Sequence, residues 1–338
     1  MGSGLSVRLY DASGHDREAE LRPGMAKGLR SHQLLWIDLT GREPAILMAV
    51  TAAVGLDASQ AERLTHVPAA VDLTQYADHI HLVLDAMEIP PEEAPASAAK
   101  KPELVPFSVV PVSRPLDIVA GRNWVLTVHD EPLEAMRRVD TANEGETRLG
   151  ALDAGDFVAG VADEVLVGYF ALIERVEQEI DALDELALRH RPDNHFLTRI
   201  VAVRRRISLI RRTLAPHRAA FAAFARPEME LHKELGRPWP GLTERLERSL
   251  DSVENLRDLL LGTFDIHMGR AAQDANEVMK VLTLLSAILL PSVVLAGVMG
   301  MNFQLSFFDD PNNFWWVIAA MVAFGVLMLG FARWRHWL

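Results

Sequence analysis

Five residues near the C-terminus are spaced so that they lie along one side of a single helix. They are Asp265, Asn276, Thr283, Leu290 and Gly297, separated by 11, 7, 7 and 7 residues. Each step is close to a whole number of helical turns, so the side chains form a stripe that is polar at its first end and small or apolar at its last. The stripe predicts a hydrated pore lining, with a helix interface as the alternative.

Two uncharged runs must position this stripe. Residues 281–301 form 21 consecutive uncharged residues, and residues 314–332 form 19 more. A hydrocarbon core of about 30 Å needs roughly 20 helical residues at about 1.5 Å each, so each run predicts a membrane-spanning helix. Two buried core helices of a soluble protein are the alternative. Trp315 and Trp316 open the second run, as is typical of the boundary between membrane and water.

The charges beside the two runs predict the orientation of the chain. The second run is followed by three basic or titratable residues, Arg333, Arg335 and His336. The loop before it carries no Lys or Arg and two acids, Asp309 and Asp310. The positive-inside rule then places both termini in the cytoplasm. Because the first 41 residues mix charges throughout, they predict no signal peptide, and we expect a multi-pass protein of the inner membrane.

Composition argues against several other classes. The chain has no cysteine, so it has neither disulfides nor thiolate metal ligands. A formal net charge of −12 argues against nucleic acid as a partner, because phosphate binding needs a basic surface. There is no P-loop, no GxGxxG after a strand, no HExxH and no GxSxG. We therefore expect neither an enzyme nor a bound cofactor.

Residues 1–150 predict a mixed α/β domain. Short β-branched or alternating segments predict strands at residues 5–10, 33–39, 79–87, 105–112, 116–120 and 123–129. Residues 44–54 and 58–66 have helical composition, and Asp57 is a predicted N-cap for the second of these helices. Residues 90–102, rich in Pro, Ala, Glu and Lys, predict an exposed loop.

Residues 151–280 predict a helical stalk that leads into a transmembrane hairpin, residues 281–338. Apolar residues first recur at three- and four-residue steps between Val158 and Ala187, with many acids elsewhere. A second predicted helix, about residues 196–225, is basic and carries Arg199, Arg204, Arg205, Arg206, Arg211 and Arg212. An acidic helix followed by a basic one predicts an antiparallel pair with complementary faces, although solvated surface charge would give the same pattern.

The remaining helix predictions concern prolines. Pro216 predicts a kink in the second helix. The third helix begins near Leu242 and meets no proline before Pro291, which lies inside the first membrane run. One helix from Leu242 to Gly300 would be about 90 Å long at about 1.5 Å per residue. A helix of this length needs partners from its own chain or from copies of itself.

The first membrane run ends in Gly300-Met301-Asn302. A GMN triplet that closes the first of two C-terminal membrane helices resembles the signature of the CorA-type metal ion transporters, in the superfamily that also contains ZntB. The preceding residues 276–283, Asn-Glu-Val-Met-Lys-Val-Leu-Thr, resemble the inner helix of that family. The resemblance is specific over residues 265–302 and is weaker upstream.

This resemblance implies a homopentamer with a funnel-shaped cytoplasmic α/β domain and a pore formed by the inner helices. Its cargo would be Mg²⁺, and also Co²⁺ or Ni²⁺. Carried over by position, five Asn302 amide oxygens would form the outer selectivity ring and hold the ion through its water shell, with Gly300 allowing close packing at the neck. Leu290 would form an apolar constriction, and Asp265 an acidic ring that contacts the metal.

The chain departs from the family pattern in two places. The family typically has an acid two residues after the asparagine of the triplet, where this chain has Gln304. Asp309 and Asp310 are the candidates to attract cations instead, and an ordinary turn explains them equally well. The stalk position expected to hold a regulatory carboxylate is Gly241, so regulation by cytoplasmic Mg²⁺ is not predicted.

Two other functions stay open. A zinc transporter of the ZntB branch is kept open by the 12 histidines, of which His79 and His81 fall on one face of a predicted strand. A structural role is commoner for such a pair. A membrane-anchored regulatory protein that conducts nothing is the alternative from another class, but it would need neither the polar stripe nor the GMN triplet.

Overall fold

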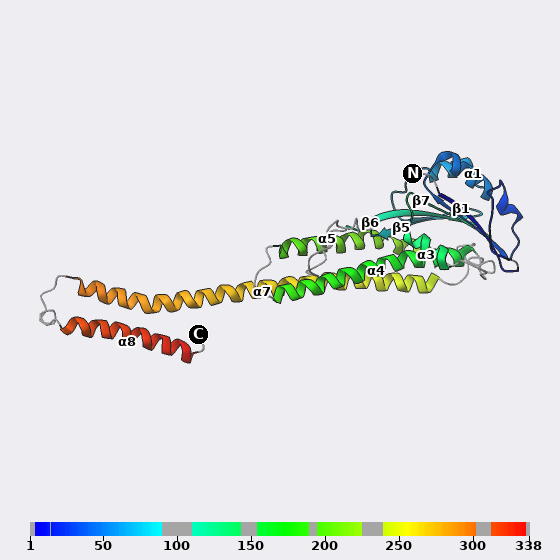
Figure 1. Cartoon of the computed structure of the whole chain (residues 1–338). Helices are drawn as coiled ribbons and strands as arrows, with labels where there is room; N and C mark the ends of the chain where they lie inside the picture. Colours follow the sequence, from blue (N-terminus) through cyan, green and yellow to red (C-terminus); the bar gives the residue numbers. More distant parts are fainter. Residues whose placement is uncertain are drawn as a thin grey trace, which may run out of the picture. The chain divides into compact units, whose positions relative to one another are not determined.

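The computed structural model describes residues 4–13, 15–89, 110–142, 154–188, 195–224, 239–301 and 312–335. Contacts divide the chain into two compact units, Met1–Thr263 and Phe264–Leu338, which are considered separately below. Figure 1 shows the helices and strands of both units and labels most of them. The expected division into three parts, at residues 150 and 280, stays a prediction.

The first unit is built on one sheet, which contains seven strands among the described residues (Figure 1). Their bounds are β1 (Gly4–Asp11), β2 (Arg17–Glu18), β3 (Gln33–Thr40), β4 (Asp72–Gln75), β5 (Ile80–Glu88), β6 (Val112–Ala120) and β7 (Trp124–His129). The spatial order is β2-β1-β3-β7-β6-β5-β4. β3 and β7 run parallel, and the other neighbours in this sheet run antiparallel. The predicted α/β character is confirmed.

Helices cover both faces of this sheet. Their bounds are η1 (Met25–Gly28), α1 (Pro44–Val54), α2 (Ala58–Leu64), α3 (Glu134–Ala142), α4 (Ala154–Leu188), α5 (Phe196–Leu214), α6 (His217–Phe224) and α7 (Trp239–Met299), of which α7 continues into the second unit. α1 and α2 pack on one face, where Leu35, Leu47 and Leu126 share a core. The Asp57 carboxylate accepts a hydrogen bond from Gln60 N–H at 2.9 Å, which confirms the predicted N-cap of α2.

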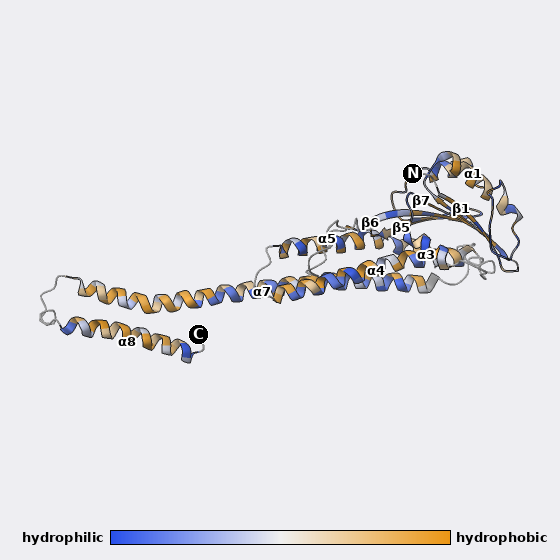
Figure 2. Ribbon diagram, viewed as in Figure 1, coloured by the Kyte–Doolittle hydropathy of each residue, from blue (hydrophilic) through white to orange (hydrophobic). Residues whose placement is uncertain are grey.

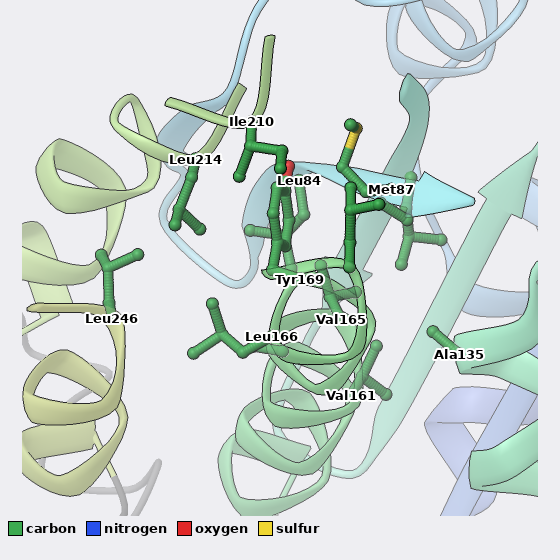
Figure 3. Packing of buried hydrophobic residues seen from close by; sticks show 14 of the residues in the cluster. Leu84, Met87, Ala135, Val161, Val165, Leu166, Tyr169, Ile210, Leu214 and Leu246 are labelled. Carbon is green, nitrogen blue, oxygen red and sulfur yellow. The ribbon is translucent and has the colours of Figure 1, made fainter. Parts of the chain in front are cut away.

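α4 forms the centre of the larger core on the other face. Figure 3 shows Val165, Leu166 and Tyr169 of α4 among side chains from β5, α5 and the first part of α7. Leu246 of α7 belongs to the same core and is fully buried. The three- and four-residue apolar spacing predicted for α4 therefore matches the face that it buries.

The structure corrects the predicted strands around Pro115. β6 passes through this residue without a break, where the sequence predicted separate strands at 105–112 and 116–120; residues 105–109 lie outside the described part of the chain. β7 pairs with β6 only as far as Leu116, so Pro115 has no β7 partner. A proline cannot donate to a ladder, and here no neighbouring strand requires its N–H.

The edge of β5 is covered by helices rather than by a strand. β4 pairs with only four residues of β5. Beyond them, the Asp85 N–H donates to His217 Nε2 at 3.2 Å, and the Tyr169 hydroxyl donates to the Asp85 carbonyl at 2.8 Å. A Cβ at Gly168 would lie 3.3 Å from the Met87 carbonyl oxygen, so α4 approaches the strand closely there. The helices thus satisfy a strand edge that would otherwise be open to another chain.

Pro216 interrupts the second long helix more completely than predicted. The sequence predicted one kinked helix over residues 196–225, whereas α5 ends at Leu214 and α6 begins at His217. Proline removes a helical hydrogen bond and crowds the preceding turn. The break brings the fully buried His217 imidazole to β5, where Nδ1–H donates to the Leu214 carbonyl at 3.1 Å. Burial lowers the pKa of His217 to about 4, so the ring is neutral at pH 7.

The predicted pairing of α4 with α5 is centred on one buried ion pair. Arg206 donates to Glu179 Oε1 at 2.5 Å, and both side chains are about nine-tenths buried. Burial raises the pKa of Glu179, and the Arg206 guanidinium opposes that shift. Arg211 of α5 instead reaches Glu254 of α7, and Arg218 of α6 reaches Glu247 of α7. Only part of the opposite charge of the two helices is therefore used between them.

Candidate functional site

The predicted polar stripe lies on α7 within the second unit. Asp265, Asn276, Thr283, Leu290 and Gly297 all belong to one continuous helix, as the spacing predicted. All five residues are exposed in the single chain, and Leu290 is 62% exposed. At about 100° per residue they fall within about 60° of one another around the helix. The structure therefore leaves the whole stripe uncovered.

The opposite side of α7 contacts α8 (Asn312–Trp334). Leu284, Ile288 and Ser292 are partly buried on α7. A Cβ at Gly325 of α8 would lie 3.6 Å from Ile288 Cγ2. The inward side of α8 consists of Asn313, Val317, Met321, Phe324, Gly325, Met328 and Ala332. The α8-facing side of α7 is centred about 150° from the centre of the polar stripe, so α8 leaves the stripe free.

Polar side chains make a groove at the first end of the stripe. Its volume is about 370 Å³, and its lining residues are Gln273, Asn276, Glu277, Met279, Lys280 and Thr283. Gln273 and Lys280 were missed by the sequence reasoning. Their positions, three residues before and four residues after Asn276, could have indicated them, because such residues are neighbours on a helix surface.

Thr283 bonds its own helix. Its hydroxyl donates to the Met279 carbonyl at 2.7 Å, as a threonine within a helix commonly does. The bond uses the hydroxyl proton and leaves the oxygen lone pairs without a partner within the described chain. Thr283 can therefore accept a hydrogen bond from water while its own donor is satisfied.

The GMN triplet is described only in part. α7 ends at Met299, the Gly300 N–H donates to the Ala296 carbonyl at 3.0 Å, and the Met301 N–H donates to the Val298 carbonyl at 3.2 Å. A Cβ at Gly300 would make only ordinary contacts, at 3.5 Å, with backbone oxygens of its own helix. Asn302 and the loop acids Asp309 and Asp310 lie outside the described residues.

Both C-terminal helices have the length and composition to cross a membrane. Their most apolar windows have mean hydropathies of 2.4 and 2.2, and no residue of either window is buried in the chain. Figure 2 shows hydrophobic colour around the end of α7 and along α8. Core helices of a soluble protein would be mostly buried, so this exposure argues against that alternative. Trp315 and Trp316 are 69% and 72% exposed near the start of α8.

The two candidate histidines for zinc have structural partners. His79 Nδ1 lies 2.6 Å from Asp78, and its ring stacks on Tyr76. His81 Nε2 lies 2.7 Å from Asp117 Oδ1, and the other oxygen of that buried carboxylate accepts from Arg42 at 2.6 Å. Among the residues that the structure describes, no group of three or more His, Cys, Asp or Glu could hold a metal ion.

The fold and the stripe together define a membrane protein whose large α/β unit precedes two apolar helices, one of which carries exposed polar groups. Residues 31–332 match the family of CorA-like Mg²⁺ transporter proteins. The chain therefore belongs to that family.

Relatives within the family have different named cargoes. The chain is 28% identical over 235 residues to the cobalt/magnesium transport protein CorA of Thermotoga maritima, and this match covers 67% of the chain and 65% of that relative, slightly under two thirds. It is 25% identical over 234 residues to the zinc transport protein ZntB of Klebsiella pneumoniae, covering 66% of the chain and 68% of that protein. Sequence similarity alone thus leaves the cargo open.

A solved structure supports the fold along the whole chain. The complete structure of the CorA magnesium transporter from Methanocaldococcus jannaschii matches with a TM-score of 0.74 at 17% identity, covering 99% of this chain and 98% of that one. At this identity the likeness concerns the fold. The predicted order of an α/β domain, long helices and a C-terminal apolar pair is confirmed.

Proposed function

We propose that the chain carries a divalent metal cation passively across the membrane, with Mg²⁺ as the favoured cargo and Co²⁺ or Ni²⁺ as further cargoes. The observation that carries this proposal is the polar stripe on α7, which is exposed and faces away from α8. A polar stripe on a membrane helix requires water or a partner. Copies of α7 arranged around a shared axis would supply both.

The proposed assembly is a homopentamer in the inner membrane with both termini in the cytoplasm. Its α7 helices would form the pore, and its α8 helices would lie outside them against lipid. Residues 1–150 and 151–280 would form the cytoplasmic domain and stalk, and residues 281–338 the hairpin. The number five rests on the family resemblance, and the orientation rests on the flanking charges.

The proposed path uses neutral oxygens at its entrance and a charge at its exit. Mg²⁺ gives up its water reluctantly, so the Gly300-Met301-Asn302 ring would hold the hydrated ion through its water shell. Asp309 and Asp310 would raise the cation concentration outside. Inside, Asn276 and Thr283 would contact the same hydration shell, and the carboxylates of Asp265 would form the inner ring.

In the proposed mechanism, the ion path is narrowest where the residues of the stripe change from polar to apolar. Leu290 is the large apolar side chain of the stripe, and Gly297 lets the helices approach closely above it. A ring of leucines excludes water unless the helices move apart, so it can close the path without a charge. The membrane potential supplies about 2.3 kcal/mol per charge for each 100 mV, hence about twice that for a divalent ion, which suffices for uptake without ATP.

The test is ion flux into proteoliposomes that contain the full chain. Mg²⁺, Co²⁺ and Zn²⁺ are compared for the wild type, Asn302→Ala and Asn276→Ala. Ser292→Ala is the matched control, because Ser292 lies on the α8-facing side of α7 and donates to its own helix at 3.1 Å. We expect Asn302→Ala to lower Mg²⁺ flux about tenfold or more, Asn276→Ala to lower it less, and Ser292→Ala to leave it near the wild-type rate.

Two outcomes would replace the proposal. Zn²⁺ flux without Mg²⁺ flux would place the chain with the zinc transporters, an alternative supported by the similarity to ZntB. Absence of flux for every ion, under gradients of either direction, would favour a membrane-anchored protein that conducts nothing.

A further inference from the structure

Two strips of single charge sign lie on the outer sides of α4 and α5. The acidic strip is defined as Glu174, Glu177, Asp181 and Glu185 of α4. The basic strip is defined as Arg204, Arg205 and Arg212 of α5. All seven residues are exposed, and no side chain of either strip forms an ion pair with a residue that the structure describes.

Charged residues on the inner sides of the same helices form ion pairs within the chain, unlike those of the two strips. Arg206 of α5 is buried against Glu179 of α4, and Arg211 lies 3.2 Å from Glu254 of α7. α5 contains no acidic residue, so nothing on that helix neutralises the basic strip. On α4, Arg175 is the one exposed base beside the acidic strip. The chain thus presents two uncompensated faces of opposite sign.

The ion pair between α4 and α5 fixes how far along the helix axes the two strips lie relative to each other. α4 and α5 are packed antiparallel (Figure 1). Arg206 of α5 lies beside Glu179 of α4. Asp181 is two residues after Glu179, and Arg204 is two residues before Arg206. Because the helices run in opposite directions, these two residues lie at the same height, about 3 Å from the ion pair along the axis. By the same count Glu174 lies level with Arg211, next to Arg212.

We propose that the acidic strip of one copy of this chain docks against the basic strip of the next copy. This interface rests on the ring assembly proposed above. Two different faces of one chain that fit each other make a heterologous contact, which closes into a ring rather than a two-fold dimer. Rotation about an axis parallel to these helices preserves height. Asp181 of one copy therefore meets Arg204 of its neighbour, and Glu174 meets Arg212.

Apolar side chains on α5 extend this surface. Leu197 and Val201 are 53% and 46% exposed, and they lie on the same side of the helix as Arg204 and Arg205. Arginine side chains can cover such apolar surface with their stems while their charged ends reach a carboxylate. The basic strip therefore combines the two properties of a docking face, charge complementarity to a partner and apolar area to bury.

The absence of cysteine gives a direct test by cross-linking. Two full-length single-cysteine variants, Asp181→Cys and Arg204→Cys, are co-expressed with tags of different size and treated with a short bismaleimide. We expect a cross-linked species that contains both tags. Glu62→Cys with Arg204→Cys is the matched control, because Glu62 is exposed on α2, which packs on the other face of the sheet. The Asp181 pair should give a several-fold higher yield.

Charge reversal tests whether the contact depends on the two strips. Arg205→Glu with Arg212→Glu should lower the cross-link between positions 181 and 204 several-fold. Adding Glu174→Arg and Glu177→Arg should restore it, which a misfolded variant would not allow. A yield equal to the control, or efficient cross-linking of Asp181→Cys to itself, would overturn the interface.

Native mass spectrometry of the same preparations separates this inference from the proposed function. An intact ring without the cross-link between positions 181 and 204 would overturn the strip contact and leave the ring standing. A monomeric chain would overturn both. A ring that is cross-linked through the strips yet carries no ion would support the interface and remove the transport proposal.

Discussion

Helix α7 passes through two regions that bury apolar side chains by different means. Up to Thr263 one side of the helix packs its apolar residues into the core of the first unit, where Leu246 is fully buried. In the second unit Val278 and Leu290 are 68% and 62% exposed. The chain covers its own apolar surface in the first region and leaves that task to lipid or to other copies in the second. Within one continuous helix, the first part therefore has the side-chain pattern of a protein in water, and the second part has that of a protein in lipid.

Matched leucine substitutions should give the largest difference in stability between the two regions. Leu246→Ala should lower the free energy of unfolding of the first unit by roughly 2–5 kcal/mol, because it leaves a cavity in a closed core. Leu327→Ala on α8, where the side chain is 70% exposed, should cost less than about 1 kcal/mol in detergent, because the surrounding solvent fills the space. Hydrogen exchange of full-length protein, read separately for peptides of each unit, measures both effects.

The contrast would fail if Leu327→Ala destabilised the chain as much as Leu246→Ala. In that case α8 would bury Leu327 against another protein surface, and the proposed lipid-facing position of that side would be wrong.

Acid should act on the first unit through His217. Its pKa is about 4 in the folded chain and near 6.5 when unfolded, so the unfolded state binds the extra proton between these values. Stability of the α6 and β5 region should fall as the pH falls from about 6.5 to about 4, by up to roughly 3 kcal/mol, and level off below. Protection of peptides from β5 and α6 measures this. His217→Gln should remove the dependence over that window.

Peptides from α8 provide the internal control, since Arg333 is the one charged residue between Asn312 and Trp334. Equal loss of protection in α8 and β5 over the same pH range would show that another group is responsible.

Substitution of two threonines of α7 should give the smallest change in stability. The same substitutions compare the two regions by ion flux. Thr263 donates to the Leu259 carbonyl at 3.1 Å and is buried, whereas Thr283 donates to the Met279 carbonyl at 2.7 Å and is exposed. Valine at either position keeps the shape, and we expect less than about 1 kcal/mol of destabilisation in both cases. Ion flux should fall only for Thr283→Val. Equal flux for both variants would remove Thr283 from the proposed path.

Features governed by neighbouring residues could be predicted from the sequence. The α1 boundaries, the Asp57 cap and the uninterrupted course of α7 follow from spacing and capping chemistry. The predicted break of β6 was wrong because the tolerance for Pro115 depends on where β7 ends, which no local pattern records. The kink at Pro216 became a complete break, and no local pattern records that His217 beyond it accepts a hydrogen bond from Asp85 of β5.

The polar stripe also has features that could be predicted from neighbouring residues and features that depend on tertiary contacts. Its spacing predicted that the five residues share one side of α7, since helical periodicity is a local property. That α8 occupies the opposite side is a tertiary contact, and it depends on small residues such as Gly325 meeting Ile288. Gln273 and Lys280 were missed because a single helix pattern does not show which polar neighbours will remain uncovered.

The covering of the β5 edge has a consequence for synthesis of the chain. The strand is made long before the side chains that close it, because Asp85 and His217 are 132 residues apart. At about 5–20 residues per second, the ribosome needs roughly 7–26 s to add that stretch. During this time the backbone groups of β5 are open to any other unpaired strand. Slower elongation or crowded polysomes should therefore increase aggregation of nascent chains before the membrane helices have been made.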